Sequence, residues 1–435
     1  MITVGLDFGT HQTKVCVEKK EGVECKYSFF KFKDTHGVMQ YTLPSIIYVG
    51  EDGRMSYGYL PDASKGFFDW LFGRNRDEKG RYVRYFKQSV FCTSHARLLS
   101  HEDAMYYSTW YLASILFDLE KVYGQEFSIQ MGVPTDGGHL DFAKETAVRL
   151  LVAAYRLVED VFDNDKKKFL QTDIQSLKEL TTIPDYSNQI KDEYNILVFP
   201  EAYACLKPLT SRGKIANGMS LMVDIGGGTT DISFFTIEKD MPQVYDFFSI
   251  DKGLNYLTNA FNIDNDTRKS SNVKDASEID PVKKESLSKD IRNECGKLTA
   301  RLQKEFKQQC KLNMSRLMDA LKDRPLIYCG GGSTFKELQI AYNGFTEVKL
   351  VSHKEWDMKS VVDAGDIIAK GLCPILSTAY GLAISVANDK ISKKPFTDIF
   401  QGIRGLEEQK ASKRSDSFGS AYGGFSYGDD WDAWK

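Results

Sequence analysis

Residues 7–15 read DFGTHQTKV, and residues 224–232 read DIGGGTTDI. Aligned position by position, the two stretches share an initial aspartate, a glycine two residues later and a threonine four residues after that. Each stretch follows an apolar segment typical of a β-strand and opens a second such segment, so each predicts a β-hairpin. Because the copies lie half a chain apart, they predict two similar lobes that face a shared cleft.

The chemistry of these hairpins suits phosphate. Glycine has no side chain, so backbone N–H groups beside it can approach a phosphate closely. We therefore expect a phosphate chain to be gripped by Gly9, Thr10, His11, Gly226, Gly227, Gly228 and Thr229. Carboxylates repel phosphates unless a cation intervenes, so Asp7 and Asp224 are interpreted as ligands of a hydrated Mg²⁺. The alternative is that both aspartates only cap turns.

The two hairpins differ at one informative position. Lys14 stands in the first copy where Asp231 stands in the second. A lysine at this position can neutralise a β-phosphate, whereas an aspartate can orient an attacking water or accept its proton. The pair therefore predicts a division of labour between binding and hydrolysis.

A third glycine-rich loop follows a predicted strand at residues 326–329. Its residues are Gly330, Gly331, Gly332 and Ser333, and they would let a nucleoside lie against the backbone. Phe335 either packs on a base or fills the core. The chain contains neither a GxxxxGK[ST] loop nor a GxGxxG loop, which disfavours a P-loop enzyme and a Rossmann dinucleotide site.

Together, the three loops resemble those of the actin, sugar-kinase and seventy-kilodalton heat-shock ATPase superfamily. The second loop is most similar to the heat-shock version, and Lys14 is more similar to the actin branch. The resemblance covers about residues 1–387. It implies an α/β fold with two lobes, each a ribonuclease-H-like sheet carrying an inserted subdomain, that close on Mg²⁺ with ATP or ADP.

The resemblance also implies a domain organisation. Residues 1–200 would form lobe I, with an inserted subdomain at about 38–100. Residues 201–387 would form lobe II, with an inserted helical subdomain at about 251–321.

The catalytic residues implied by the resemblance are Asp231, Lys87 and Glu201. Asp231 matches an acidic position that handles water, and Lys87 matches a heat-shock lysine that reaches the γ-phosphate. Phe199 stands where the family has a water-orienting side chain, so we expect Glu201 to substitute for it.

The long helix predicted at residues 288–322 departs from the family at its adenosine contacts. Gly296, Thr299 and Ala300 occupy positions where the family has longer polar side chains. Lys297 and Arg301 are the expected substitutes in nucleotide binding.

Composition and charge narrow the alternatives. The chain has 435 residues, 57 Lys and Arg against 60 Asp and Glu, and a formal net charge of −3, which disfavours nucleic acid as a partner. No apolar run approaches the roughly 18–20 residues of a membrane span, and the N-terminus reads as a strand rather than a signal peptide. The eight cysteines form no CxxC pair. They predict buried thiols in a cytoplasmic protein rather than a disulfide framework or a zinc site.

The last residues, 388–435, have a different composition. Residues 415–435 read SDSFGSAYGGFSYGDDWDAWK, in which aromatic residues are spaced among Gly, Ser and Asp. This composition is typical of a disordered, solvated tail. The alternative is a docking peptide for a protein partner, with residues 430–434 as its anchor.

Three functions fit these patterns. The first is a nucleotide-switched, chaperone-like or regulatory ATPase of the heat-shock type without a substrate-binding domain. The second is an actin-like ATPase that forms filaments. The third is a small-molecule kinase, for which an aspartate such as Asp136 would have to act near the cleft.

Overall fold

The structure, a computed structural model, describes residues 1–22, 24–59, 80–91, 99–134, 139–210, 220–238, 241–257, 279–309, 325–340 and 347–389. The predicted tail lies outside these ranges from residue 390 onward, as does Asp136. Within them, no helix combines the length and the apolar character that crossing a membrane requires.

The first lobe is built on a sheet with the first hairpin at its centre. Its main path is β11-β10-β1-β2-β3, in which β1, β10 and β11 are parallel to one another and β2 and β3 are antiparallel to their neighbours. The bounds are Ile2–Asp7 for β1, Gln12–Glu21 for β2, Glu24–Phe29 for β3, Ser128–Val133 for β10 and Ile196–Pro200 for β11.

The second lobe repeats this topology. Its sheet runs β14-β13-β12-β15-β16, with β12, β15 and β16 parallel and with β13 and β14 antiparallel to their neighbours. The bounds are Ser220–Ile225 for β12, Thr230–Glu238 for β13, Met241–Ile250 for β14, Pro325–Cys329 for β15 and Glu347–Leu350 for β16. The two sheets therefore share one strand order and one set of directions. This duplication gives the two-lobed α/β architecture that the repeated hairpins predict.

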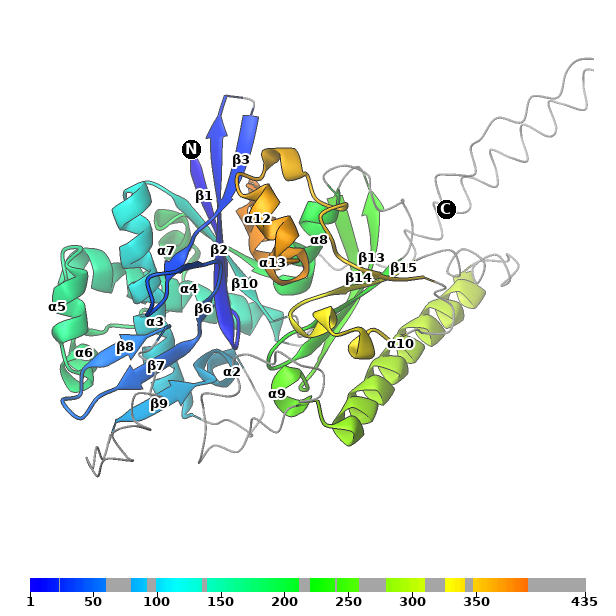
Figure 1. Ribbon diagram of the computed structural model, residues 1–435, viewed down its shortest axis with the longest axis horizontal. Coiled ribbons are helices and arrows are strands. Elements are labelled where there is room, and N and C mark those ends of the chain that lie inside the picture. Colours follow the sequence, from blue (N-terminus) through cyan, green and yellow to red (C-terminus); the bar gives the residue numbers. More distant parts are fainter. Residues whose placement is uncertain are drawn as a thin grey trace, which may run out of the picture.

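Helices separate and cover the two sheets. α3 (His101–Tyr123) and α4 (Leu140–Arg156) share a core with the first sheet, and α10 (Pro281–Gln309) shares a core with the second. α8 (Glu201–Thr210) and α13 (Cys373–Ala383) belong to a core that includes residues of both sheets. Figure 1 shows α8 and α13 between the blue strands of the first lobe and the green strands of the second. Because α8 and α13 pack on both sheets, this central layer fixes the position of one hairpin relative to the other.

The close approach of α13 to β1 has a simple sequence origin. A Cβ atom on Gly5, in the middle of β1, would lie 2.2 Å from the backbone nitrogen of Ala383. No side chain fits there, so the glycine lets the helix backbone lie directly on the strand. The sequence alternation had identified the strand but not this contact.

Smaller elements complete the first lobe. In the region predicted as an insertion, β8-β7-β9 form a three-stranded sheet followed by the short helix α2. The bounds are Phe32–Lys33 (β4), Met39–Gln40 (β5), Leu43–Pro44 (β6), Ile46–Val49 (β7), Met55–Tyr57 (β8), Arg81–Arg84 (β9), Phe86–Phe91 (α2) and a π-helical turn at Leu157–Val161. α2 packs on α3 through the ring of Phe86, which lies against Phe8 and Tyr111. Thus α2 is fixed beside the end of β1.

Three parts of the sequence interpretation are corrected by the structure. Residues 163–194 are charged and poorly periodic, so the sequence predicts a surface excursion. In the structure they contain α5 (Lys166–Gln171), α6 (Ile174–Leu180) and α7 (Asn188–Glu193). These helices are too short to show a clear period, but Asp165, Asp173 and Ser187 cap their N-termini through side-chain hydrogen bonds.

The other two corrections concern the second lobe. The long helix begins at Pro281 rather than at residue 288, because proline is well tolerated in a first turn; it is described as far as Gln309, and its predicted remainder lies outside the described ranges. The sequence also predicts a helix after the loop at 330–332, but the structure has two short 3₁₀ turns there, Gly332–Thr334 and Lys336–Leu338. Short helices α9 (Leu254–Leu257) and α12 (Ala364–Ala369) complete this lobe.

Candidate functional site

One cavity of about 260 Å³ lies where the predicted loops meet. It is lined by most of the residues that the sequence singled out: Asp7, Gly9, Thr10, His11, Lys14, Lys87, Glu201, Asp224, Gly226, Gly227, Gly228, Thr229, Asp231, Gly330, Gly331 and Phe335. These residues come from both lobes and from the inserted α2. The fold therefore brings together side chains that are spread over more than three hundred residues of sequence.

The two hairpin loops are in direct contact. A Cβ atom on Gly227 would lie 2.6 Å from Cγ of His11, and a Cβ atom on Gly228 would lie 3.2 Å from Cγ2 of Thr10. The absence of a side chain at Gly227 is thus what allows the His11 ring to lie against the opposite loop. Removal of this ring from water lowers the pKa of His11 to about 4, so the imidazole is neutral at pH 7.

The register of the hairpins places the asymmetric pair at equivalent positions. Asp7 lies opposite Lys14 across β1 and β2, and Asp224 lies opposite Asp231 across β12 and β13. In the first hairpin, Lys14 Nζ donates a hydrogen bond to Asp7 Oδ2 at 3.0 Å. Burial alone would lower the pKa of Lys14, but Asp7, Asp224 and Glu201 together raise it above its usual value. This lysine is therefore a fixed positive charge on the cavity wall.

A second ion pair joins the inserted subdomain to the start of α8. Lys87 Nζ on α2 lies 2.5 Å from Glu201 Oε1, and both side chains are largely buried. Glu201 is the first residue of α8 and faces the cavity. Phe199, two residues earlier, is 1% exposed and stacks on Tyr203. Of these two positions, Glu201 is thus the one whose side chain can act in the cavity.

The described cavity wall carries an excess of negative charge. Its carboxylates are Asp7, Glu201, Asp224 and Asp231, and its ammonium groups are Lys14 and Lys87. Burial, reinforced by the charges of Glu201 and Asp7, raises the pKa of Asp224 to about 7. Such carboxylates, closely spaced and short of counter-charge, are a suitable donor set for a divalent cation.

Asp231 is a buried carboxylate on the cavity wall. It is 4% exposed, and its Oδ1 is buried with no hydrogen-bond partner among the described residues. Its Oδ2 lies 3.2 Å from the hydroxyl oxygen of Thr229. Burial, followed by repulsion from Glu201 and Asp224, raises the pKa of Asp231 to about 7. A buried acid with this pKa is suited to proton transfer near neutral pH.

This shift predicts a pH-dependent stability effect for Asp231→Asn. The folded carboxyl retains its proton to about pH 7, whereas the unfolded one loses it near pH 3.8, so ionisation destabilises the fold as pH rises through this window. The neutral asparagine does not ionise, so the variant avoids this loss of stability. The free energy of unfolding of the variant, relative to that of the wild type, should therefore increase by at most about 3 kcal/mol between pH 5 and pH 8. Denaturant titrations without nucleotide or metal at both pH values would measure it, and an advantage that is equal at both would contradict the raised pKa.

The third loop forms the opposite wall of the cavity. Gly330 has a φ of +83°, and a Cβ atom there would lie 2.1 Å from Asp224 Oδ1, so glycine is required on both counts. Gly331 and Phe335 line the cavity, whereas Gly332 and Ser333 lie behind it and are buried. Ser333 supports the loop by donating a hydrogen bond to the carbonyl of Cys329.

Six lining residues were missed by sequence reasoning: Gln12, Leu254, Thr334, Pro374, Ile375 and Thr378. The last three lie in the first turns of α13, whose Pro374 carbonyl accepts a hydrogen bond from the Gly330 backbone at 3.0 Å. The available signal was Pro374, at the start of the apolar segment 374–387 that predicts a helix. A proline there marks a helix N-terminus but does not show what the helix faces.

Lys297 and Arg301 are not brought to the cavity. Lys297 is largely exposed and pairs with Glu294 at 2.6 Å on its own helix. Arg301 pairs with Asp246 on β14 at 2.7 Å and with Glu305 at 3.2 Å. Neither residue is among those lining the cavity. In this structure both charges are thus engaged in ion pairs of α10.

No protein-family model and no curated protein matches the chain. Among solved structures, it is similar to a non-polymerising mutant of MamK bound to AMPPNP, with 15% sequence identity and a TM-score of 0.38, over 88% of this chain and 97% of that chain. The strand order that the two sheets share supports the two-lobed α/β architecture independently of this similarity.

Proposed function

We propose that this protein binds ATP as its Mg²⁺ complex between the two lobes and hydrolyses it. The observation that carries the proposal is the meeting of two equivalent hairpins at one cavity whose described walls hold four carboxylates and two ammonium groups. Glycine-rich loops supply backbone donors for phosphates, and the uncompensated carboxylates call for a cation.

The binding roles follow from position. Asp7 and Asp224 would hold the hydrated Mg²⁺, a role that fits the burial of Asp7, the half-buried position of Asp224 on the cavity wall and the repulsion between the two carboxylates. Thr10, Thr229 and the adjoining glycines would donate to phosphate oxygens, with Lys14 neutralising the β-phosphate. Gly330, Gly331 and Phe335 would accommodate the nucleoside beside Leu254.

Hydrolysis would be the task of Asp231 and Glu201. Asp231 is an unsatisfied acid with a pKa of about 7, suited to orienting a water and accepting its proton. Glu201 would orient the same water, and Lys87 would turn from Glu201 to the γ-phosphate. Exchange of the Lys87–Glu201 pair for a Lys87–phosphate contact would report ATP to the inserted subdomain and to α8.

Of the functions open to such an ATPase, we favour a nucleotide-switched, heat-shock-70-like chaperone or regulator. The second hairpin loop and the inserted subdomain with Lys87 support it. A filament-forming ATPase is the second candidate, because Lys14, which pairs with Asp7, resembles the lysine of the actin branch. Light scattering after addition of Mg-ATP separates them, since growth of polymers would favour the filament and persistent monomers the switch.

Mg-ATP should raise the melting temperature of the full chain. A ligand that binds only the folded state adds about 2.7 kcal/mol of stability at a concentration one hundred times its dissociation constant. Differential scanning fluorimetry with ATP and Mg²⁺ measures the shift, and ATP with a chelator is the control. An unchanged melting temperature at millimolar Mg-ATP would contradict nucleotide binding.

A further inference from the structure

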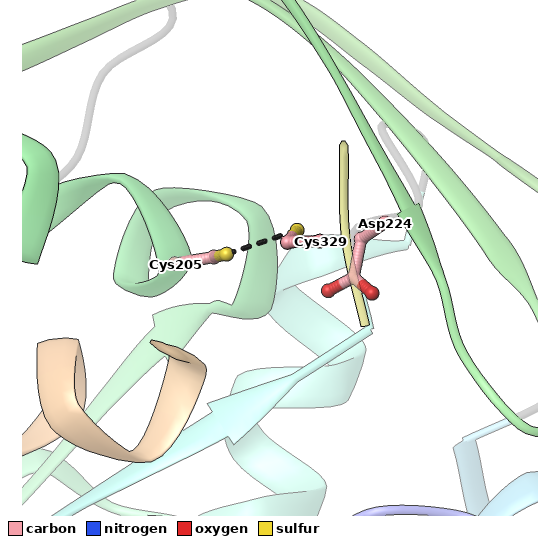
Figure 2. A group of neighbouring side chains, drawn as sticks. All are labelled: Cys205, Asp224 and Cys329. Carbon is pink, nitrogen blue, oxygen red and sulfur yellow. Dashed lines mark hydrogen bonds between the residues drawn. The ribbon is translucent and has the colours of Figure 1, made fainter. Parts of the chain in front are cut away.

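Two thiols and a carboxylate meet at the back of the cavity. Cys205 Sγ lies 3.1 Å from Cys329 Sγ, and one donor atom from each of Cys205, Asp224 and Cys329 lies within 4.8 Å of the others. Both cysteines are 0% exposed, whereas Asp224 reaches the cavity. Figure 2 shows the two sulfurs facing each other and the Asp224 carboxylate beside Cys329.

The fold assembles this group from three elements. Asp224 and Cys329 are direct partners on the parallel strands β12 and β15, near their carboxyl ends. Cys205 lies on α8 in the layer between the sheets, 124 residues before Cys329. No local spacing connects the three residues, so the sequence predicted only buried thiols here. Of the three donors, only Asp224 is among the residues that line the cavity.

We propose that Cys205, Cys329 and Asp224 form a binding site for a thiophilic divalent cation such as Zn²⁺ or Cd²⁺. Two sulfur ligands and one oxygen ligand suit this class of ion, and the cavity side leaves a fourth position for water. Tetrahedral Zn–S bonds of about 2.3 Å set the sulfurs about 3.8 Å apart, so the pair needs to separate by less than about 1 Å.

The binding step is balanced by release of protons. Burial raises the pKa of the Cys329 thiol well above its usual value, so this thiol keeps its proton in the free site. Binding forms two metal–sulfur bonds and sends both thiol protons to solvent, with no change of oxidation state. Nearby carboxylates favour a cation here: Glu201 and Asp7 both act on Asp224, while Lys14 opposes them.

Occupation of this site has a consequence that rests on the proposed function. Asp224 would be shared between the thiophilic cation and Mg²⁺, so the two ions would compete for one carboxylate. Cys329 also precedes Gly330, the first residue of the loop proposed to hold the nucleoside. A bound thiophilic cation would therefore weaken Mg-ATP binding.

Titration of the reduced full chain with Cd²⁺ alone, without nucleotide, tests the site. Cadmium–thiolate bonds give a near-ultraviolet charge-transfer absorption, which should saturate at one equivalent for this site. Cys205→Ser and Cys329→Ser should each weaken the affinity at least about tenfold. Cys25→Ser, which removes a half-buried thiol on β3, is the matched control and should leave the absorption unchanged.

Several results would overturn the proposal. The first is the absence of thiolate absorption, and the second is an absorption that persists in both serine variants. The third is that the two thiols have already formed a disulfide before metal is added. If the serine variants fail to fold, judged by their melting curves, Asp224→Asn takes their place and should weaken Cd²⁺ binding to a similar extent.

Adding Mg-ATP to the cadmium titration separates this inference from the proposed function. Competition predicts that Mg-ATP lowers the apparent Cd²⁺ affinity. If the affinity stays the same while the thiolate absorption is present, the competition is wrong and the metal site stands. If Mg-ATP binds but no absorption forms, the metal site is wrong and the nucleotide site stands.

Discussion

Asp231→Asn is expected to bind Mg-ATP but to hydrolyse it at least about 100-fold more slowly than the wild type, the lower range for loss of a general base. The amide keeps the shape of the carboxylate and its contact with Thr229, but it cannot accept a proton from water. Phosphate release in a single turnover, with enzyme in excess over ATP, would measure the chemical step without product release.

Asp246→Asn is the matched control for this substitution. Asp246 is also a buried aspartate of the same sheet, 6% exposed, but it pairs with Arg301 and lies outside the residues that line the cavity. Its variant should hydrolyse ATP at the wild-type rate. Equal rates for Asp231→Asn and the wild type would remove Asp231 from the chemistry and would leave Glu201 as the candidate base.

Gly227→Ala is expected to lower the affinity for Mg-ATP at least about fivefold, which corresponds to the lower end of the roughly 1–3 kcal/mol typical of overpacking. The new methyl group would lie 2.6 Å from the His11 ring, too close for a real contact, so the ring or the loop that carries it must shift. A wider gap separates the donors of one hairpin from those of the other. Isothermal titration with Mg-ATP measures the loss.

Two further variants isolate the cause of this effect. Gly365→Ala places the same methyl group in open space on α12 and should bind Mg-ATP as the wild type does. The double variant Gly227→Ala with His11→Ala removes the clash and should bind more tightly than Gly227→Ala alone. If His11→Ala brings no such gain, the contact between the two loops is not what positions the phosphate donors.

The hairpins were predictable because their pattern is local. Alternating apolar residues fix each strand, and the spacing between Asp7 and Lys14 repeats between Asp224 and Asp231, so cross-strand register follows from the turn. The prediction of two similar lobes then needed only the repeat. Each sheet begins with an equivalent hairpin, so the first two strands of each lobe pair in the same way.

The remaining features depend on packing between distant segments. The Lys87–Glu201 pair joins residues 114 positions apart, and the Cys205–Cys329 contact joins residues 124 apart. The local sequence pattern does not indicate which residues so far apart will be in contact. Lys297 and Arg301 were expected to contact the nucleotide because of their place in the sequence. In the structure they form ion pairs instead, Lys297 along α10 and Arg301 with β14. The rotation of a helix about its axis depends on the sheet it packs against.

The most direct test of the account is isothermal titration of ATP with and without Mg²⁺, using the wild type, Asp7→Ala and Asp224→Ala. The account predicts one ATP bound per chain by the wild type, with Mg²⁺ strengthening binding, and a loss of most of that strengthening in both variants. Because each variant removes a negative charge facing the phosphates, binding of metal-free ATP should stay the same or improve. No binding by the wild type, or equal enhancement by Mg²⁺ in all three folded proteins, would contradict the proposal that the two hairpins hold one Mg-ATP between them.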